Sequence, residues 1–150
     1  MNTEQLSKIL YLTQGITGEV GVAKLRSVAS AGNRHPFNNY IMVNNVSGLE
    51  KGLYFYDHLN EKLVPLKLAD LTKEFQDACL GQKMIANCQI SFIQTAVTAR
   101  TTSRYHERGY RYIFLDAGHI GAQVQLICEN IGLGSCAMWV HSSTIKYQNF

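Results

Sequence analysis

The first segment of the chain combines helical spacing of apolar residues with a starting signal. Apolar residues three to four positions apart predict one face of a helix over residues 2–16. Asn2, with Gln5 three positions later, has the spacing of a capping box at the start of this helix. Either Gly15 or Gly18 is expected to end it. The predicted buried face consists of Leu6, Ile9 and Leu10.

Four later segments have the pattern of β-strands. Residues 40–46 form a short apolar run that predicts a strand. Residues 52–57 and 62–68 flank a polar turn and predict a hairpin, and Pro65 favours an edge position for its second strand. Residues 88–99 alternate and are rich in β-branched side chains, which predicts a fourth strand.

Helical spacing returns in the second half of the chain. Residues 68–80 predict a helix that ends at Gly81, and residues 108–131 predict a much longer one. The long helix is apolar around most of its girth, so we expect it to be central and buried. A final buried strand is expected over 135–140. Strands mixed with helices in this order indicate an α+β fold with a long central helix. The helical positions used for the long helix are Phe114, Ala117, Gly121 and Val124.

Composition limits the class of protein. The chain has 150 residues, 46% of them apolar and 17% charged, which fits one globular domain over residues 1–150. A net charge of +3 favours neither a nucleic-acid partner nor a membrane surface. No membrane-length apolar run or signal-peptide pattern is present, and four scattered cysteines without ligand spacing predict no metal site. We expect a cytoplasmic protein.

Residues 18–38 are rich in Gly, Ser, Ala and Asn and predict an ordered loop. Small residues within it would let the backbone approach a flat or charged ligand, and the flanking Arg26 and Arg34 suit a phosphate or a polarised carbonyl. An ordinary surface loop with two solvated arginines explains the same composition. The glycines of 132–134 likewise fit either a helix end with a turn or a ligand-facing backbone.

The stretch RYHERGYRY, residues 104–112, mixes arginine and tyrosine in a way that RNA-binding surfaces also use. Glu107 and Asp116 interrupt the positive charge, which argues against that function. The buried helix predicted to follow indicates instead that part of the stretch is buried and that its arginines pair with carboxylates.

Taken together, four stretches in order resemble one family over nearly the whole chain. The chain is similar to the SagB-type dehydrogenases of the nitroreductase superfamily, which include the flavin subunits that oxidise thiazolines and oxazolines in modified peptides. The stretches are residues 10–18, residues 26–43 with 48–57, residues 104–123 and residues 129–139.

The resemblance implies an FMN-dependent oxidoreductase with a mixed, mostly antiparallel sheet, acting as a homodimer that holds flavin at the subunit interface on a small-molecule or peptide substrate. Two short segments and their flanking arginines would contact the cofactor. Gly132, Gly134 and Ser135 would supply backbone donors to the N5/O4 edge of the flavin. The other implied cofactor-binding residues are Arg26, Ser30, Ala31, Gly32 and Arg34.

The resemblance also implies two catalytic positions. The related peptide oxidases carry a Lys-Tyr pair that removes a proton while hydride goes to the flavin, and Arg104-Tyr105 occupies that place here. Arginine stays protonated, so Tyr105 is the expected proton-handling group. Ala29 and Asn38 also differ from the family pattern.

The chain is expected to be shortened at both ends relative to the family, without the segments that usually hold the FMN phosphate. Arg26, Arg34 or Lys146 would then substitute, or a partner protein would supply the missing parts. The alternative function is a degenerate, non-catalytic or accessory flavin-fold protein that needs such a partner chain.

Overall fold

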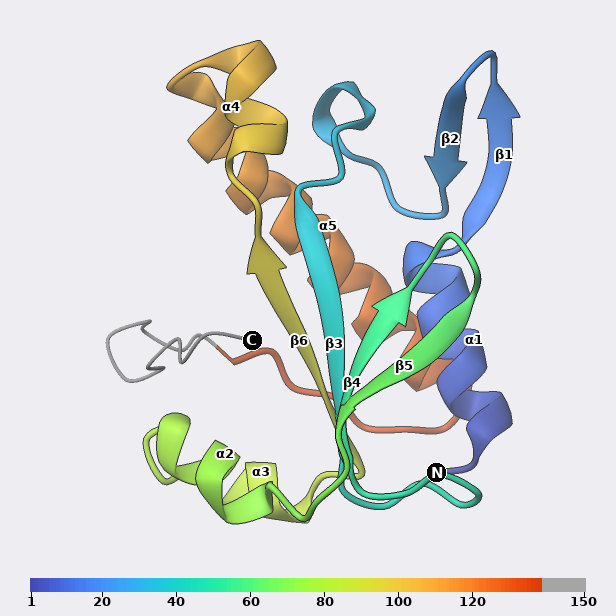
Figure 1. Ribbon diagram of the computed structural model, residues 1–150, viewed down its shortest axis with the longest axis vertical. Helices are drawn as coiled ribbons and strands as arrows, with labels where there is room; N and C mark the ends of the chain where they lie inside the picture. Colours follow the sequence, from blue (N-terminus) through green and yellow to red (C-terminus); the bar gives the residue numbers. More distant parts are fainter. Residues whose placement is uncertain (139–150) are drawn as a thin grey trace.

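Helices and strands succeed one another throughout residues 1–138, the part of the chain that the computed structural model describes (Figure 1). The predicted α+β class is confirmed. The elements are α1 (Thr3–Gln14), β1 (Ile16–Val20), β2 (Ala23–Arg26), the 3₁₀ turn η1 (Ala31–Asn33), β3 (Phe37–Val43), β4 (Gly52–Asp57), β5 (Lys62–Lys67), α2 (Thr72–Ala78), α3 (Lys83–Asn87), β6 (Ile90–Ala96), α4 (Ala99–Tyr105) and α5 (Arg108–Asn130).

The first helix forms as its sequence predicts. Asn2 accepts a hydrogen bond from the Gln5 backbone N–H, and the Gln5 side chain accepts one from the Asn2 backbone, which completes the capping box. The helix ends at its C-cap, Gly15, as one of the two predicted end points. The predicted range 2–16 is too long at its C-terminal end, because Ile16 is already the first residue of β1.

Residues 18–38 are more regular than predicted. They contain most of a β1–β2 hairpin, the turn η1 and the start of β3 rather than one loop. The hairpin escaped detection because its two strands are short and carry glycine and charged residues. Figure 1 shows it projecting from one end of the molecule.

The main sheet has the order β5-β4-β3-β6, and all of its pairings are antiparallel. The β4–β5 hairpin and the edge position of Pro65 are confirmed, because β5 lies at the end of the sheet. The strand predicted at 40–46 is displaced toward the N-terminus, since β3 begins at Phe37. The strand predicted at 88–99 is shorter in the structure. It covers Ile90–Ala96 as β6, and α4 already begins at Ala99.

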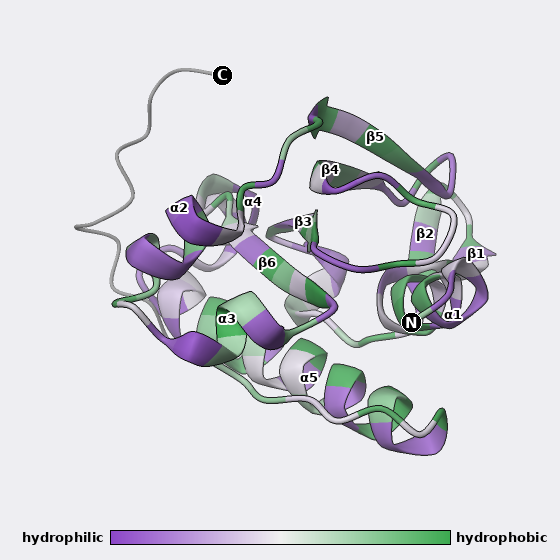
Figure 2. Ribbon diagram, turned by 90° about the horizontal axis from the view of Figure 1, so that it is seen from below, coloured by the Kyte–Doolittle hydropathy of each residue, from purple (hydrophilic) through white to green (hydrophobic). Residues whose placement is uncertain are grey.

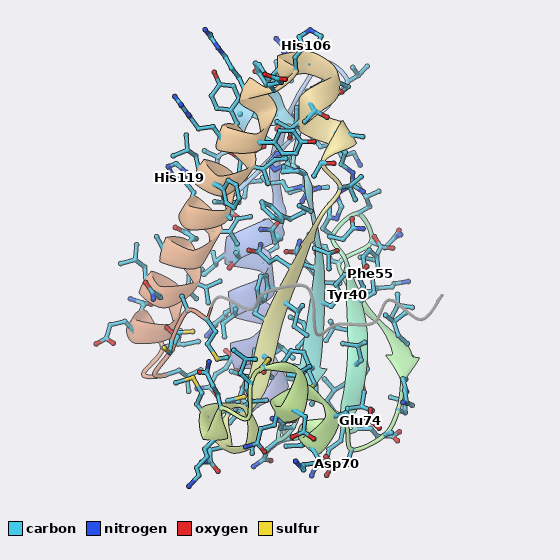
Figure 3. The ribbon with its side chains drawn as sticks, turned by 90° about the vertical axis from the view of Figure 1, so that its left-hand side faces the viewer. Tyr40, Phe55, Asp70, Glu74, His106 and His119 are labelled. Atoms are coloured by element: carbon cyan, nitrogen blue, oxygen red, sulfur yellow. The ribbon has the colours of Figure 1, made fainter. Side chains whose placement is uncertain are left out.

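Helices α1 and α5 cover one face of the sheet, and α2 and α3 lie near one end of the other face (Figure 2). The core under α1 contains Leu6, Leu10, Ile41 and Tyr54. Val28, Phe37, Ile113 and Ile120 form the core under α5. On the opposite face Tyr40 and Phe55 pack ring against ring, 5.5 Å apart (Figure 3).

The helix predicted over 68–80 is confined to α2 and followed by a second short helix, α3, that was not predicted. The Asp70 side chain accepts the Thr72 backbone N–H and so favours a helix start after Leu68.

The long helix has nearly the predicted bounds but not the predicted burial. Phe114 is 69% exposed and Leu126 is 68% exposed, so the expectation of a central, fully buried helix is wrong. The buried face holds Ile113, Ile120 and Ile127 at helical spacing. The sheet packs against one side of α5 only, and the other side of α5 lies at the molecular surface (Figure 2).

The final predicted strand, 135–140, is also partly wrong. Residues 135–138 are neither strand nor buried in the described chain, and the rest of that range lies outside the described residues.

Candidate functional site

The small loop, residues 30–34, is shaped by unusual backbone geometry. Gly32 has φ +58°, and Asn33 and His35 also have positive φ values. This region of backbone space is open to glycine and unfavourable for most side chains. The loop therefore turns sharply just before β3 and exposes the Gly32 backbone.

A buried carboxylate fixes the small loop to α5. Asp116 is only 5% exposed and accepts hydrogen bonds from Ser30 Oγ at 2.6 Å and from the Ala31 backbone N–H at 3.1 Å. Ser30 Oγ in turn accepts the His35 backbone N–H at 2.8 Å. Sequence reasoning did not assign this role to Asp116. The available signal was an acidic residue on the same helical face as Ile113 and Ile120.

Tyr105, at the end of α4, reaches the small loop. A Cβ atom added to Gly32 would collide with Tyr105 Oη, so the phenol group lies directly against this glycine. The Tyr105 ring also meets Tyr112 edge to face at 4.9 Å. The two predicted positions Gly32 and Tyr105, 73 residues apart by their numbers, are thus brought together.

The two predicted arginines of the loop region differ in their surroundings. Arg26 is half-buried, donates to Gln14 Oε1 at 3.0 Å and has Nη2 2.6 Å from His58 Nε2. Burial and the positive charge of Arg100 lower the pKa of Arg26 to about 10. Arg34 is exposed at the end of the small loop.

The arginines of 104–112 do not behave as predicted. Within residues 1–138 the ion pairs involve lysines only, so the expected pairing of these arginines with carboxylates is wrong. Arg104 is exposed and lies over the Tyr105 ring, 5.6 Å from its centre. The predicted ion pairs are not required, because exposed guanidinium groups are solvated by water and gain little from a carboxylate partner.

The second glycine segment lies where α5 ends. Gly132 has φ +73°, and Gly132, Gly134 and Ser135 are all exposed. Added Cβ atoms at both glycines would meet no atom within 4 Å among the described residues. The backbone N–H groups of Gly134 and Ser135 have no hydrogen-bond acceptor in the described chain. Two exposed N–H donors that lack an acceptor within residues 1–138 fit the polar edge of a flat ring.

The predicted cofactor-binding residues therefore form two groups at opposite ends of α5. Ser30, Ala31 and Gly32 lie beside the N-terminal half of this helix through Tyr105 and Asp116, whereas Gly132–Ser135 follows its last turn. The helix has 23 residues, and a rise of 1.5 Å per residue makes it about 34 Å long. One chain does not bring the two groups together.

Two further structural observations concern other site classes. Residues 1–138 contain no cluster of three metal-ligating side chains. None of the helices in this part of the chain has the length and apolar character needed to cross a membrane.

Comparison with known sequences places these features in context. The profile of the family described as "Nitroreductase family" matches residues 1–143. "Putative nitroreductase MJ1384" of Methanocaldococcus jannaschii is 33% identical over 138 residues, covering 92% of this chain and 68% of that protein. The trifolitoxin-processing protein TfxB of Rhizobium leguminosarum bv. trifolii is 33% identical over 113 residues, covering 72% of this chain and 30% of that protein.

Solved structures share the fold. A nitroreductase-named protein from Anabaena variabilis superposes with a TM-score of 0.78 at 30% identity, over 83% of this chain and 26% of that one. The Escherichia coli microcin synthetase McbBCD complex, bound to truncated pro-MccB17, contains a chain that superposes with a TM-score of 0.73 at 18% identity, over 89% of this chain and 52% of that one. This chain therefore spans about a quarter to a half of the length of these structural relatives.

Proposed function

The chain belongs to the nitroreductase family, and from this premise we propose that it is an FMN-dependent oxidoreductase of the SagB type. The proposed reaction is the oxidation of an azoline ring in a modified peptide, or related chemistry on a small molecule. The relative named for trifolitoxin processing supports a peptide substrate, because it is 33% identical over 72% of this chain. The likeness to the microcin synthetase complex supports the fold alone.

The contact between Tyr105 Oη and Gly32 is the observation that carries the proposal. FMN, when bound, accepts a hydride at N5 of its ring. Oxidation of an azoline also releases a proton, and a hydroxyl can take up that proton while it passes its own to water. Tyr105 meets this need at the small loop, where its Oη occupies the space left by the missing Gly32 side chain. The Arg104 guanidinium, which lies over the Tyr105 ring, would orient Tyr105 or attract an anionic substrate.

The division of the cofactor-binding residues into two groups supports a homodimer. Asp116, which holds the small loop, lies 16 residues before Gly132, so the two groups are about 24 Å apart along the axis of α5. FMN is shorter than this, so the small loop and Gly132–Ser135 of one chain cannot both contact one molecule. Two copies that pair along α5 in opposite directions would bring the small loop of one subunit next to Gly132–Ser135 of the other. Each flavin would then lie at the subunit interface.

The outer side of α5 has the residues that such pairing needs. We call this the α5 surface. Small residues between its large apolar side chains would let two helices approach closely. The α5 surface consists of Tyr110, Phe114, Leu115 and Leu126, all exposed, with Gly118, Gly121 and Ala122 among them.

Absorbance of the purified protein tests the proposal. We expect a flavin spectrum after addition of FMN and removal of the excess, with FMN released on denaturation. A protein that stays colourless would contradict the oxidoreductase assignment and favour an accessory protein that needs a partner chain.

Tyr105→Phe then tests the proposed catalytic role. This variant should keep bound FMN but reduce it about 100-fold more slowly with substrate, as expected when one proton-transfer group is removed. Arg108→Gln, an exposed change at the start of α5, serves as the control. Equal reduction rates in Tyr105→Phe and wild type would remove Tyr105 from the mechanism.

A further inference from the structure

Positive and neutral donor groups gather beside the small loop, and none of them forms an ion pair with an acid of residues 1–138. We call Gln14, Arg26, His35, His58 and Arg100 the Arg26 cluster. Arg26 contacts Gln14 and His58 through its two terminal nitrogens. Arg100 joins the cluster from α4, where its Nη1 donates to the His35 carbonyl oxygen at 3.3 Å. Five different segments of the chain thus supply this one cluster.

The charge of the Arg26 cluster is not neutralised within the described chain. No carboxylate in residues 1–138 forms an ion pair with Arg26 or Arg100. Burial and Arg26 lower the pKa of both His35 and His58 to about 4, so both rings are neutral at pH 7. A half-buried guanidinium that meets only neutral groups is costly, because it loses water without gaining an opposite charge.

The acids closest to the cluster are already occupied by other donors. Asp57 accepts hydrogen bonds from the backbone and side chain of Asn60 and from the Leu59 backbone. Asp116 is held by Ser30 and Ala31. Neither side chain reaches Arg26 as an ion pair.

Two other titratable groups face the cluster. Lys24 adds positive charge near His58. Burial raises the pKa of Tyr56, which keeps that phenol neutral beside Arg26. The electrostatic environment is therefore positive on balance.

A second observation at the same place also calls for an oxygen acceptor. Gln14 is 1% exposed, and its Nε2 donor is buried with no hydrogen-bond partner among the described residues. Gln14 lines one small crevice together with Arg26, His35 and Asp116, whose carboxylate oxygens already accept hydrogen bonds from Ser30 and Ala31. A buried amide donor without an acceptor is unfavourable by itself. Arg26 lacks an opposite charge and Gln14 Nε2 lacks an acceptor. One negatively charged oxygen group would supply both.

We propose that the Arg26 cluster binds an oxyanion, either a phosphate or a carboxylate. Guanidinium groups present paired N–H donors that match the oxygens of both anions. The oxyanion has two possible sources, the phosphate of FMN and an acidic group of the substrate. The proposal stands on the cluster itself and does not depend on the flavin chemistry proposed above.

Titration of the flavin-free protein with inorganic phosphate tests the site. Calorimetry should show saturable binding to wild type, and Arg26→Gln should weaken it about tenfold or more, as expected for the loss of a charged hydrogen-bond donor. The pKa of His58, followed by NMR, should rise from about 4 when phosphate binds to wild type. Arg108→Gln is the matched control and should bind phosphate as wild type does.

Two results would overturn the proposal: absence of saturable phosphate binding to wild type, or equal affinity in wild type and Arg26→Gln. If Arg26→Gln fails to fold, Arg100→Gln replaces it, because Arg100 is exposed and its removal leaves no buried charge. It should weaken phosphate binding in the same direction, and unchanged affinity would again contradict the site.

Comparison of FMN with riboflavin then identifies the source of the oxyanion. If the FMN phosphate occupies the cluster, Arg26→Gln weakens FMN binding but not riboflavin binding, and phosphate competes with FMN. If a substrate acid occupies it, both flavins bind equally in both proteins, and phosphate competes with substrate instead. A protein that binds phosphate but no flavin would retain this site and lose the proposed oxidoreductase function.

Discussion

At the scale of single residues, Gly32 positions the group that we propose handles the proton. Its φ of +58° produces the turn of the small loop, and its missing side chain leaves the space that Tyr105 Oη occupies. The Tyr105 ring is held in turn by Tyr112 and lies beneath Arg104. The backbone shape and the phenol position therefore depend on each other.

Gly32→Ala should destabilise the protein through two separable effects. The positive φ alone should cost about 1–2 kcal/mol of unfolding free energy, and displacement of Tyr105 should add about 1 kcal/mol. In a Tyr105→Phe background the second contribution should largely disappear, because the colliding oxygen is gone. Urea denaturation of the wild type, Gly32→Ala, Tyr105→Phe and the double variant measures both contributions to the unfolding free energy. Identical costs of Gly32→Ala in the two backgrounds would show that Tyr105 moves aside freely.

At the scale of elements, α5 links the candidate site to the core. Its buried face packs Ile113 and Ile120 under the sheet, and Asp116 on that same face holds the small loop. Its outward face is apolar but exposed, and His119 there points away from the sheet (Figure 3). One helix thus carries the packing, the loop anchor and the surface proposed for pairing.

Asp116→Ala should release the small loop from α5. The change leaves Ser30 Oγ and the Ala31 N–H without their acceptor, so we expect a loss of about 2 kcal/mol in unfolding free energy. Hydrogen exchange at the Ala31 amide should accelerate more than exchange in β3 and β4. Glu129→Ala, an exposed change on the same helix, is the control and should alter neither measurement. Unchanged Ala31 exchange would mean that other contacts hold the loop.

At the scale of the whole molecule, the residues of the candidate site form two groups along α5. The Tyr105 end offers the small loop and the Arg26 cluster, and the other end offers the N–H groups of Gly134 and Ser135, which have no acceptor within residues 1–138. Each half lacks what the other supplies. Pairing along the α5 surface would complete two equal sites at once, as two-fold symmetry requires.

Phe114→Glu should convert the proposed dimer into a monomer and abolish FMN binding. A carboxylate buried between two helices without a partner is strongly unfavourable, whereas the folded monomer should tolerate it because Phe114 is 69% exposed. Sedimentation analysis measures the association, and absorbance measures the bound flavin. Leu59→Glu replaces another exposed apolar side chain, in the turn between β4 and β5 and outside α5, and this variant should stay dimeric. A wild-type protein that sediments only as a monomer would contradict the pairing.

Much of the secondary structure follows from local patterns. The capping box of α1, the β4–β5 hairpin and the bounds of α5 each depend on residues close together in sequence, and each formed nearly as predicted. The β1–β2 hairpin and α4 were missed because short elements carry few periodic positions. Their stability comes from neighbours that a local pattern does not contain.

The candidate site divides in the same way. The residue types could be read from the sequence, such as the glycines at 32 and 132 and the pair Arg104-Tyr105 where the family has Lys-Tyr. Contacts that join Gly32 to Tyr105, Ser30 to Asp116 and Arg26 to His58 arose only when the chain folded. Backbone preference is a property of each residue and its nearest neighbours, whereas burial, charge compensation and exposure depend on which distant segments pack together. That is why the bounds of α5 could be predicted and its exposed face could not.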